Sequence, residues 1–218
     1  MKWNPNLAYA IGLITADGSL SKDGRHIDFT SKDIEQIKNL KKILNLKNKI
    51  GTKYSGRKDG KIYFRIQFGD VKFYRFLNSI GLNPNKTKNL KIVLVPEKYF
   101  IDFLRGVLDG DGFTYSYWDK RWKSSFMLYT GVVSASKKNL EWMKKKIYKL
   151  YGIEGRIRYA GKSTFQLVYA KHNSIILLGK IYYSNNLICL KRKLLKIRKS
   201  LCIINKSAGM AKLVNAQS

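Results

Sequence analysis

The chain has 218 residues, of which 43 are Lys or Arg and 14 are Asp or Glu, so its net charge is +29. Hydrophobic residues make up 44% of the chain, which is enough for a folded core and excludes a disordered protein. Its apolar runs are far shorter than the roughly 20 residues that cross a bilayer. Residues 1–5 lack the apolar stretch of a signal peptide, so we expect an intracellular protein of a prokaryotic cytoplasm or an organelle.

So high a positive charge indicates a polyanionic partner, with nucleic acid as the leading candidate and a generally basic protein, such as a ribosomal one, as the alternative. Cys189 and Cys202 do not form a disulfide scaffold and fit a reducing compartment. With only His26 and His172 beside them, a Cys/His zinc site is close to excluded.

A repeat divides the chain into two halves. The apolar segments 7–18 and 100–112 both end in Asp-Gly, and aligning these ends places Gly12 on Gly106 and Asp17 on Asp111. In each half a first hairpin, a helical pattern, a second hairpin and a further helix follow. The pattern is αββαββα, twice, which predicts an α+β fold of two pseudo-symmetric repeats.

The elements follow in chain order. In the first half we expect a helix after Ser31, a hairpin of 50–55 and 61–68, and a helix over 71–80. A linker begins at about residue 83 and runs to residue 96. The second half repeats the series with a helix ending near Gly152, a hairpin of 154–159 and 164–169, and a helix over 173–183. We therefore predict a first repeat at 1–95, a second at 96–204, and a loosely held tail at 205–218.

The strand at 61–68 alternates between two faces. Ile62, Phe64, Ile66 and Phe68 form an apolar face, and the opposite face carries Lys61, Tyr63, Arg65 and Gln67. Arg156 and Arg158 give the second half a similar polar face. Such side chains reach phosphates and base edges. For the first hairpin of the second half, with Phe113, Tyr115, Tyr117, Trp118 and Trp122, the sequence does not decide which aromatics pack and which touch a ligand.

The motif itself predicts a metal site. Glycine inside a helix costs about 1 kcal/mol relative to alanine, so Gly12 and Gly106 indicate two helices in close backbone contact. Their C-terminal ends would bring Asp17 and Asp111 together. Two carboxylates with nearby carbonyl oxygens suit Mg²⁺, which can support phosphodiester hydrolysis.

These residues resemble the LAGLIDADG homing endonucleases in their single-chain, two-repeat form. Residues 104–112, LRGVLDGDG, are a close match to the motif, whereas residues 10–18, AIGLITADG, have Thr15 in place of the first aspartate. The resemblance extends over both repeats. It implies antiparallel sheets that form a saddle over double-stranded DNA, with the paired motif helices at its centre.

The resemblance also implies an activity and its residues. It implies cleavage of both DNA strands across the minor groove, leaving short 3′ overhangs, by a monomer that needs no protein partner. Two or three Mg²⁺ or Mn²⁺ ions would be shared by Asp17 and Asp111, helped by the carbonyls of Ala16 and Gly110. Lys86 and Lys191 would act near the scissile phosphates, with plain phosphate contact as the alternative role. Ser31 and Ser136 lie where related proteins often carry a polar, water-ordering side chain.

The expected DNA contacts are polar or aromatic side chains of the strands and hairpins. They are Ser19, Ser21, Arg25, Asp28, Thr30, Ser31, Lys53, Ser55, Arg57, Lys61, Tyr63, Arg65, Gln67, Tyr115, Tyr117, Lys120, Arg121, Lys123, Ser136, Arg156, Arg158, Lys162, Thr164 and Gln166.

The function expected from the sequence is therefore a site-specific, intron-encoded homing endonuclease with a long DNA target. The alternative is an RNA maturase or a non-cleaving DNA-binding protein on the same scaffold. We interpret Asp109 as a helix-end residue rather than a ligand. An intein is disfavoured because the chain does not start with Cys or Ser or end in His-Asn.

Overall fold

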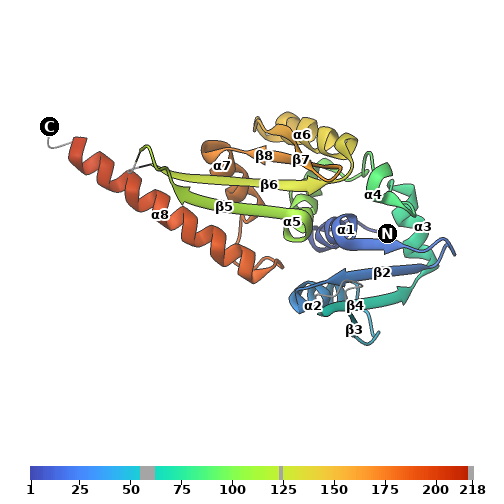
Figure 1. Cartoon of the computed structure of the whole chain (residues 1–218). Helices are drawn as coiled ribbons and strands as arrows, with labels where there is room; N and C mark the ends of the chain where they lie inside the picture. The colour runs from blue at the N-terminus through green and yellow to red at the C-terminus, as the bar shows by residue number, and fades with distance from the viewer. Residues whose placement is uncertain (55–61, 123–124, 216–218) are drawn as a thin grey trace.

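The computed structural model describes residues 1–54, 62–122 and 125–215. Figure 1 shows two sheets with helices, and between them the paired helices α1 and α5. The first repeat consists of α1 (Pro5–Asp17), β1 (Gly18–Leu20), β2 (His26–Ser31), α2 (Ile34–Ile43), β3 (Gly51–Tyr54), β4 (Ile62–Gly69) and α3 (Val71–Ser79).

A connecting segment with α4 (Lys86–Asn89) and the short 3₁₀ helix Glu97–Tyr99 leads into the second repeat. This repeat consists of α5 (Phe100–Asp111), β5 (Gly112–Trp118), β6 (Phe126–Ser134), α6 (Lys137–Tyr151), β7 (Arg156–Gly161), β8 (Thr164–Tyr169) and α7 (Lys171–Ile181). The αββαββα order predicted for both halves is thus confirmed.

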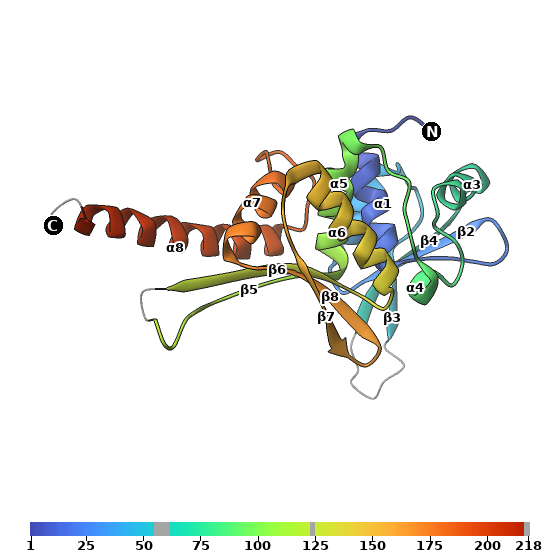
Figure 2. The ribbon, with the colours of Figure 1, turned by 90° about the horizontal axis from the view of Figure 1, so that it is seen from above.

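Each repeat has a four-stranded antiparallel sheet, ordered β1-β2-β4-β3 in the first and β5-β6-β8-β7 in the second. The alternation expected for β4 holds in its second half, where Ile66 and Phe68 are buried and Gln67 between them is exposed, whereas Ile62 at its start is exposed. Figure 2 shows α1, α5, α6 and α7 on one side, with the sheets below them. The other face of each sheet, which we call the outer face, is therefore free of these helices.

Backbone contact between α1 and α5 joins the repeats. A Cβ atom at Gly12 would lie 2.1 Å from the Phe103 carbonyl oxygen, and one at Gly106 would lie 2.1 Å from that of Tyr9. No L side chain fits at either position, which explains both glycines of the motif. The Asn4 side chain caps α1 by accepting a hydrogen bond from the Leu7 amide (2.9 Å), so the helix begins where its buried segment begins.

The last helix is α8 (Lys191–Asn215), which extends into the segment 205–218 that we expected to be a loosely held tail. Its first part runs beside the β5–β6 hairpin in both views (Figures 1 and 2). Ile197, Ser200 and Ile204 are its buried positions, and Ser200 Oγ lies 3.0 Å from Ser116 Oγ of β5. Because so few positions of α8 are buried, its apolar residues show only a weak helical period in the sequence. Within the described residues, no helix is both long and apolar enough to span a membrane.

Candidate active site and nucleic-acid interface

The C-terminal ends of α1 and α5 meet at the middle of the molecule. Asp17 is the last residue of α1 and Asp111 the last of α5. A Cβ at Gly110 would lie 2.4 Å from the Ala16 Cβ and 3.0 Å from Asp17 Oδ2, so only glycine lets the two ends approach this closely. The structure therefore brings the two aspartates together.

Both carboxylates are held in surroundings that disfavour their charge. Partial burial raises the pKa of Asp17 to about 7, and the negative charge of Asp111 adds to the shift, while Lys86 and Lys193 oppose it. The Asp111 side chain reaches solvent. Even so, the protein atoms packed around its carboxylate raise the pKa of Asp111. A divalent cation between the two groups would relieve this unfavourable charge.

A lysine binds the end of each motif helix. Lys86 Nζ donates to the carbonyl oxygens of Thr15 (2.5 Å) and Ala16 (3.3 Å) at the end of α1. Lys193 Nζ donates to the carbonyls of Leu108 (2.8 Å) and Gly110 (3.1 Å) at the end of α5, and to that of Gly112 (2.7 Å). The carbonyls of Thr15, Ala16 and Gly110 lie in the last turn of each helix, where helical donors run out, whereas that of Leu108 also accepts from the Gly112 amide. Ammonium groups also match the negative end of the helix dipole.

Burial also changes the proton affinity of these lysines. Desolvation lowers the pKa of Lys86 to about 8, although Asp17 and Asp111 both raise it. Desolvation lowers the pKa of Lys193 as well. The site thus combines two carboxylates with one buried ammonium group, that of Lys86, and one half-buried group, that of Lys193.

The structure does not place Lys191 beside the helix ends. Its side chain is exposed, and its backbone amide donates to Glu35 Oε2 (3.1 Å), whereas Lys193 occupies the place that corresponds to Lys86. Two residues along a helix are about 200° apart, so the two lysines point in nearly opposite directions. The run Lys191-Arg192-Lys193 gives no way to choose among its members until the start of α8 is known. Arg192 instead pairs with Asp33 at the start of α2 (2.6 Å).

The two serines are not equivalent to each other. Ser31 Oγ accepts from the Asp33 amide (3.0 Å), and in the second repeat Ser134 Oγ accepts from the Ser136 amide (3.1 Å), so Ser134 is the counterpart of Ser31. Ser136 is buried, caps α6 by accepting from the Asn139 amide (3.3 Å), and donates to the Leu90 carbonyl. It does not reach the outer face, and the expected DNA contact at Ser136 is wrong.

Ser31 remains next to the site. It lines a cavity of about 230 Å³ together with Asp17, Gly110 and Arg192. Its hydroxyl donates to Gln36 Oε1 (2.5 Å), and Gln36 Nε2 donates to the Asp109 carbonyl (2.5 Å). Gln36, which the sequence did not single out, thus links α2 to the end of α5.

Asp109 is a structural centre of the second repeat. Its carboxylate accepts from the hydroxyls of Tyr9 (2.8 Å) and Tyr182 (2.9 Å) and from the Leu190 amide (2.6 Å), and burial raises its pKa. These bonds use the carboxylate fully and fix the approach to α8. They agree with its interpretation as a residue other than a metal ligand.

On the outer face of the first sheet, polar side chains form continuous rows across the strands. Ser19 pairs with Asp28 and Asp28 with Gln67; Thr30 pairs with Arg65 and Lys53 with Tyr63. Arg65 forms an ion pair with Asp28 across β2 and β4. Apart from Asp28 this face is neutral or cationic, as expected of a surface that binds phosphate.

The outer face of the second sheet differs because an aromatic ladder covers part of it. Phe113, Tyr115 and Tyr117 stack along β5 at centroid distances of 6.0 and 6.3 Å, and Tyr115 stacks on Tyr129 of β6 at 5.0 Å. The register places Phe113 in one row with Gly131, Val168 and Arg156. These four rings therefore lie on the outer face; Phe113 is one of the aromatics that the sequence left undecided, and Tyr129 was not singled out from the sequence.

The remaining expected contacts lie around these faces. Trp118 packs against Phe126, with centroids 5.0 Å apart, on the opposite side of β5 from the ladder. Arg158 Nε donates to Gln166 Oε1 (3.0 Å) on the outer face, and Arg121 pairs with Asp119 (3.3 Å). The other expected contacts in the described turns and strands are Ser21, Arg25, Lys120, Lys162 and Thr164. Ser55, Arg57, Lys61 and Lys123 lie outside the described residues.

The oxygen atoms at the helix ends fit a hard divalent cation. Asp17, Asp111 and the adjacent carbonyl oxygens are ligands that Mg²⁺ accepts, and each carbonyl keeps a lone pair beside its lysine contact. Across residues 1–54, 62–122 and 125–215, no group of three or more His, Cys, Asp or Glu could hold a metal. A cation here would thus need oxygen atoms beyond the two carboxylates, such as carbonyls, water or a bound phosphate.

Comparison with known proteins agrees with this geometry. Residues 4–81 match the family model described as a LAGLIDADG-like domain. The resemblance to the LAGLIDADG family is thereby confirmed for the first repeat, and the complete chain has the two-repeat form of the fold. A search of curated protein sequences finds no significant match.

Solved structures match over nearly the whole chain. The LAGLIDADG homing endonuclease I-LtrWI bound to its target DNA has 14% identity and a TM-score of 0.59, covering 97% of this chain and 96% of that one. I-DmoI in complex with DNA and Ca has 18% identity and a TM-score of 0.56, with coverages of 88% and 97%. Full-length DUF199/WhiA from Thermatoga maritima has 15% identity and a TM-score of 0.58, with coverages of 100% and 69%. At these identities the matches establish the fold.

Proposed function

We propose that the protein is a site-specific DNA endonuclease of the homing type that hydrolyses both strands of a long target with the help of a divalent cation. The observation that carries this proposal is the meeting of Asp17 and Asp111 at the ends of the paired helices, between two sheets with polar outer faces. In this proposal residues 1–95 and 96–204 each contribute one aspartate and one binding sheet.

The chain's own residues divide the work. The outer faces bind the duplex, so that its minor groove lies over the ends of α1 and α5. Asp17, Asp111 and the carbonyls of Ala16 and Gly110 would hold Mg²⁺ or Mn²⁺, which supplies charge neutralisation at the phosphate and a more acidic bound water.

Two ammonium groups lie beside these ligands. Lys86 and Lys193 are fixed by helix carbonyls, so each is positioned to stabilise the charge that develops on a phosphorane. Lys86 contacts two carbonyls and Lys193 contacts three, so the two ammonium groups have different surroundings. The two DNA strands could therefore be cut at unequal rates.

The fold alone does not distinguish cleavage from binding, because structural matches at 14% and 15% identity support the fold and not the activity. A non-cleaving DNA-binding protein or an RNA maturase is therefore the second candidate. The two aspartates favour cleavage. A binding protein gains nothing from paired carboxylates that repel phosphate and each other.

The test uses a randomised library of DNA duplexes with Mg²⁺. The wild-type protein should cut a small set of related sites, whereas Asp17→Asn and Asp111→Asn should bind the same sites without cutting them. Glu141→Gln removes an equal charge from the outer surface of α6 and should cut normally. If the wild-type protein binds a site but cuts nothing in Mg²⁺ or Mn²⁺, the protein is a binding protein and the proposal fails.

A further inference from the structure

The outer surface of α6 carries a dense cluster of positive charge that the proposed cleavage site does not use. The helix has six lysines among its 15 residues and one acidic residue, Glu141. Leu140, Met143 and Ile147 are its buried apolar positions, and they pack it against the inner face of the second sheet. The lysines therefore point away from both outer faces.

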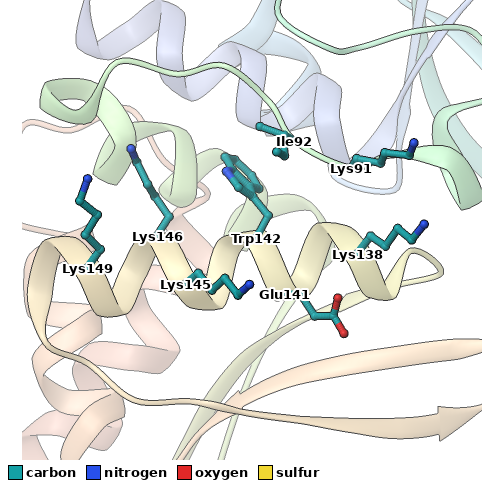
Figure 3. A pocket seen from close by; sticks show the side chains of 8 residues that line it. All are labelled: Lys91, Ile92, Lys138, Glu141, Trp142, Lys145, Lys146 and Lys149. Atoms are coloured by element: carbon teal, nitrogen blue, oxygen red, sulfur yellow. The ribbon is translucent and has the colours of Figure 1, made fainter.

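A pocket of about 420 Å³ lies between this surface and the segment that joins the repeats (Figure 3). Ile92 of the joining segment and Trp142 of α6 lie opposite each other in it, and Lys91, Lys138 and Lys145 lie around them. The Trp142 ring is held edge-on by neighbouring rings, with centroids 5.8 Å from Phe100 and 6.0 Å from Phe103. The pocket thus combines a fixed aromatic side chain with ammonium groups at its rim.

Within the part of the chain that the structure describes, most of this charge has no carboxylate partner. Glu97 pairs with Lys146 (2.7 Å) and Lys149 (3.7 Å), and Glu141 pairs with Lys137 (3.7 Å). Among the described residues, no carboxylate lies within ion-pair distance of the remaining cations. These are Lys91, Lys138, Lys144 and Lys145. Such unpaired charges repel one another unless a polyanion covers them.

A second pocket of about 380 Å³ adjoins the first. Lys145 lines both pockets, and Lys144 and the 55% exposed ring of Tyr148 line the second. Lys145 therefore lies between two hollows, each with one aromatic ring, and Glu154 and Arg156 also line the second.

We propose that the outer surface of α6 is a second nucleic-acid site, one that takes a single strand. Lys91, Lys138 and Lys145 bind consecutive phosphates, and unstacked bases enter the hollows beside Trp142 and Tyr148. Proteins bind single strands by this combination of cationic grooves and aromatic stacking. A duplex keeps its bases inside and leaves these hollows empty, and an acidic peptide matches the charge but has no need of the rings.

The test measures the affinity of the full chain for three fluorescent probes: uridine and thymidine oligonucleotides of about 12 nucleotides, within the usual site sizes, and a DNA duplex. Lys91→Gln/Lys138→Gln/Lys145→Gln should weaken single-strand binding at least ~10-fold and lower the magnitude of its salt slope by about 2. Duplex binding should change less than ~3-fold, since the outer faces are intact.

The matched control removes the same charge from the outer surfaces of α2 and α3. Lys38→Gln/Lys42→Gln/Lys72→Gln alters exposed lysines of the first repeat and should change each affinity less than ~3-fold, through general electrostatics alone. Tyr148→Ala, at an exposed position that the core does not need, should weaken single-strand binding at least ~5-fold without changing the salt slope.

The two single-stranded probes distinguish RNA from DNA as the strand that the site binds. It is the one whose affinity the α6 variants reduce more. Equal losses in the α6 and control variants, or an equal loss of duplex and single-strand binding, would overturn the proposal. It would also fail if a poly-glutamate peptide bound at α6 while neither oligonucleotide did.

Discussion

Asp17 and Asp111 lie close together although each disfavours the charge of the other. The unfolded chain would ionise Asp17 with a pKa near 3.8, and in the folded chain partial burial and the Asp111 charge raise that pKa to about 7. Folding therefore binds a proton at Asp17 between these pH values. Because proton binding and folding are linked, the charged form of Asp17 lowers the stability of the metal-free protein. Such a cost is common at functional sites.

The stability prediction follows from the sign of this shift. The penalty is absent below pH 3.8, grows as the pH rises to about 7, and is constant above it. Asp17→Asn mimics the neutral form, so at pH 8 in EDTA it should raise the melting temperature by about 2–6 °C, which corresponds to about 1–2 kcal/mol for a chain of this size. The difference should shrink at pH 5. A calorimetric scan in which Asp17→Asn melts below the wild type at pH 8 would contradict it.

Lys193 and Lys191 provide a matched pair of residues. Lys193→Met removes the ammonium donor from three carbonyl oxygens near the end of α5, of which that of Leu108 keeps the Gly112 amide, and should lower the free energy of unfolding by about 1–3 kcal/mol. It should also slow cleavage about 100-fold, if its ammonium group stabilises the phosphorane. Lys191→Met should change neither quantity appreciably. Single-turnover cleavage and urea titrations measure both, and equal cleavage defects in the two variants would show that Lys193 has no special role.

At the scale of elements, the sequence predicted the parts whose patterns are set by close packing. Gly12 and Gly106 indicated backbone contact between α1 and α5, and the alternation around Arg65 indicated the outer face of β4. Which of the basic residues of α8 faces the helix ends could not be predicted in this way. A run of three basic residues fits any rotation of a helix whose first residue is unknown. The aromatic ladder was left undecided for a similar reason: an aromatic residue suits either face of a strand.

The helix contact itself can be tested with two glycines in different surroundings. Gly106→Ala places a Cβ atom 2.1 Å from the Tyr9 carbonyl oxygen, so the two helices must separate, and we expect a loss of about 3 kcal/mol or more in the free energy of unfolding. A Cβ at Gly179 of α7 would meet nothing within 4 Å. Gly179→Ala should therefore stabilise the protein by about 0.5–1 kcal/mol through helix propensity. Urea unfolding measures both changes, and a tolerated Gly106→Ala would exclude the close contact.

At the scale of the whole molecule, the charge of +29 is divided among surfaces with different chemistry. The outer face of the first sheet carries Arg65, Lys53 and hydroxyl groups, and that of the second carries Arg156 and Arg158 beside the ladder of Phe113, Tyr115, Tyr117 and Tyr129. The two halves of a DNA target would therefore meet unlike surfaces. A pseudo-symmetric protein can in this way read an asymmetric site.

This division predicts different salt dependences for two pairs of substitutions in the second sheet. Arg156→Gln/Arg158→Gln removes two cationic groups and should lower the magnitude of the salt slope of duplex binding by about 2, since each phosphate contact contributes about 0.9. Tyr115→Ala/Tyr129→Ala removes neutral rings, so it should weaken binding while leaving the slope unchanged. Fluorescence anisotropy across a range of KCl concentrations separates these effects, with Lys38→Gln/Lys42→Gln on α2 as the control for charge away from the strands. Counterion release depends on charge alone. If the tyrosine pair altered the salt slope as much as the arginine pair does, the rings would act by positioning neighbouring cations and would make no direct contact with DNA.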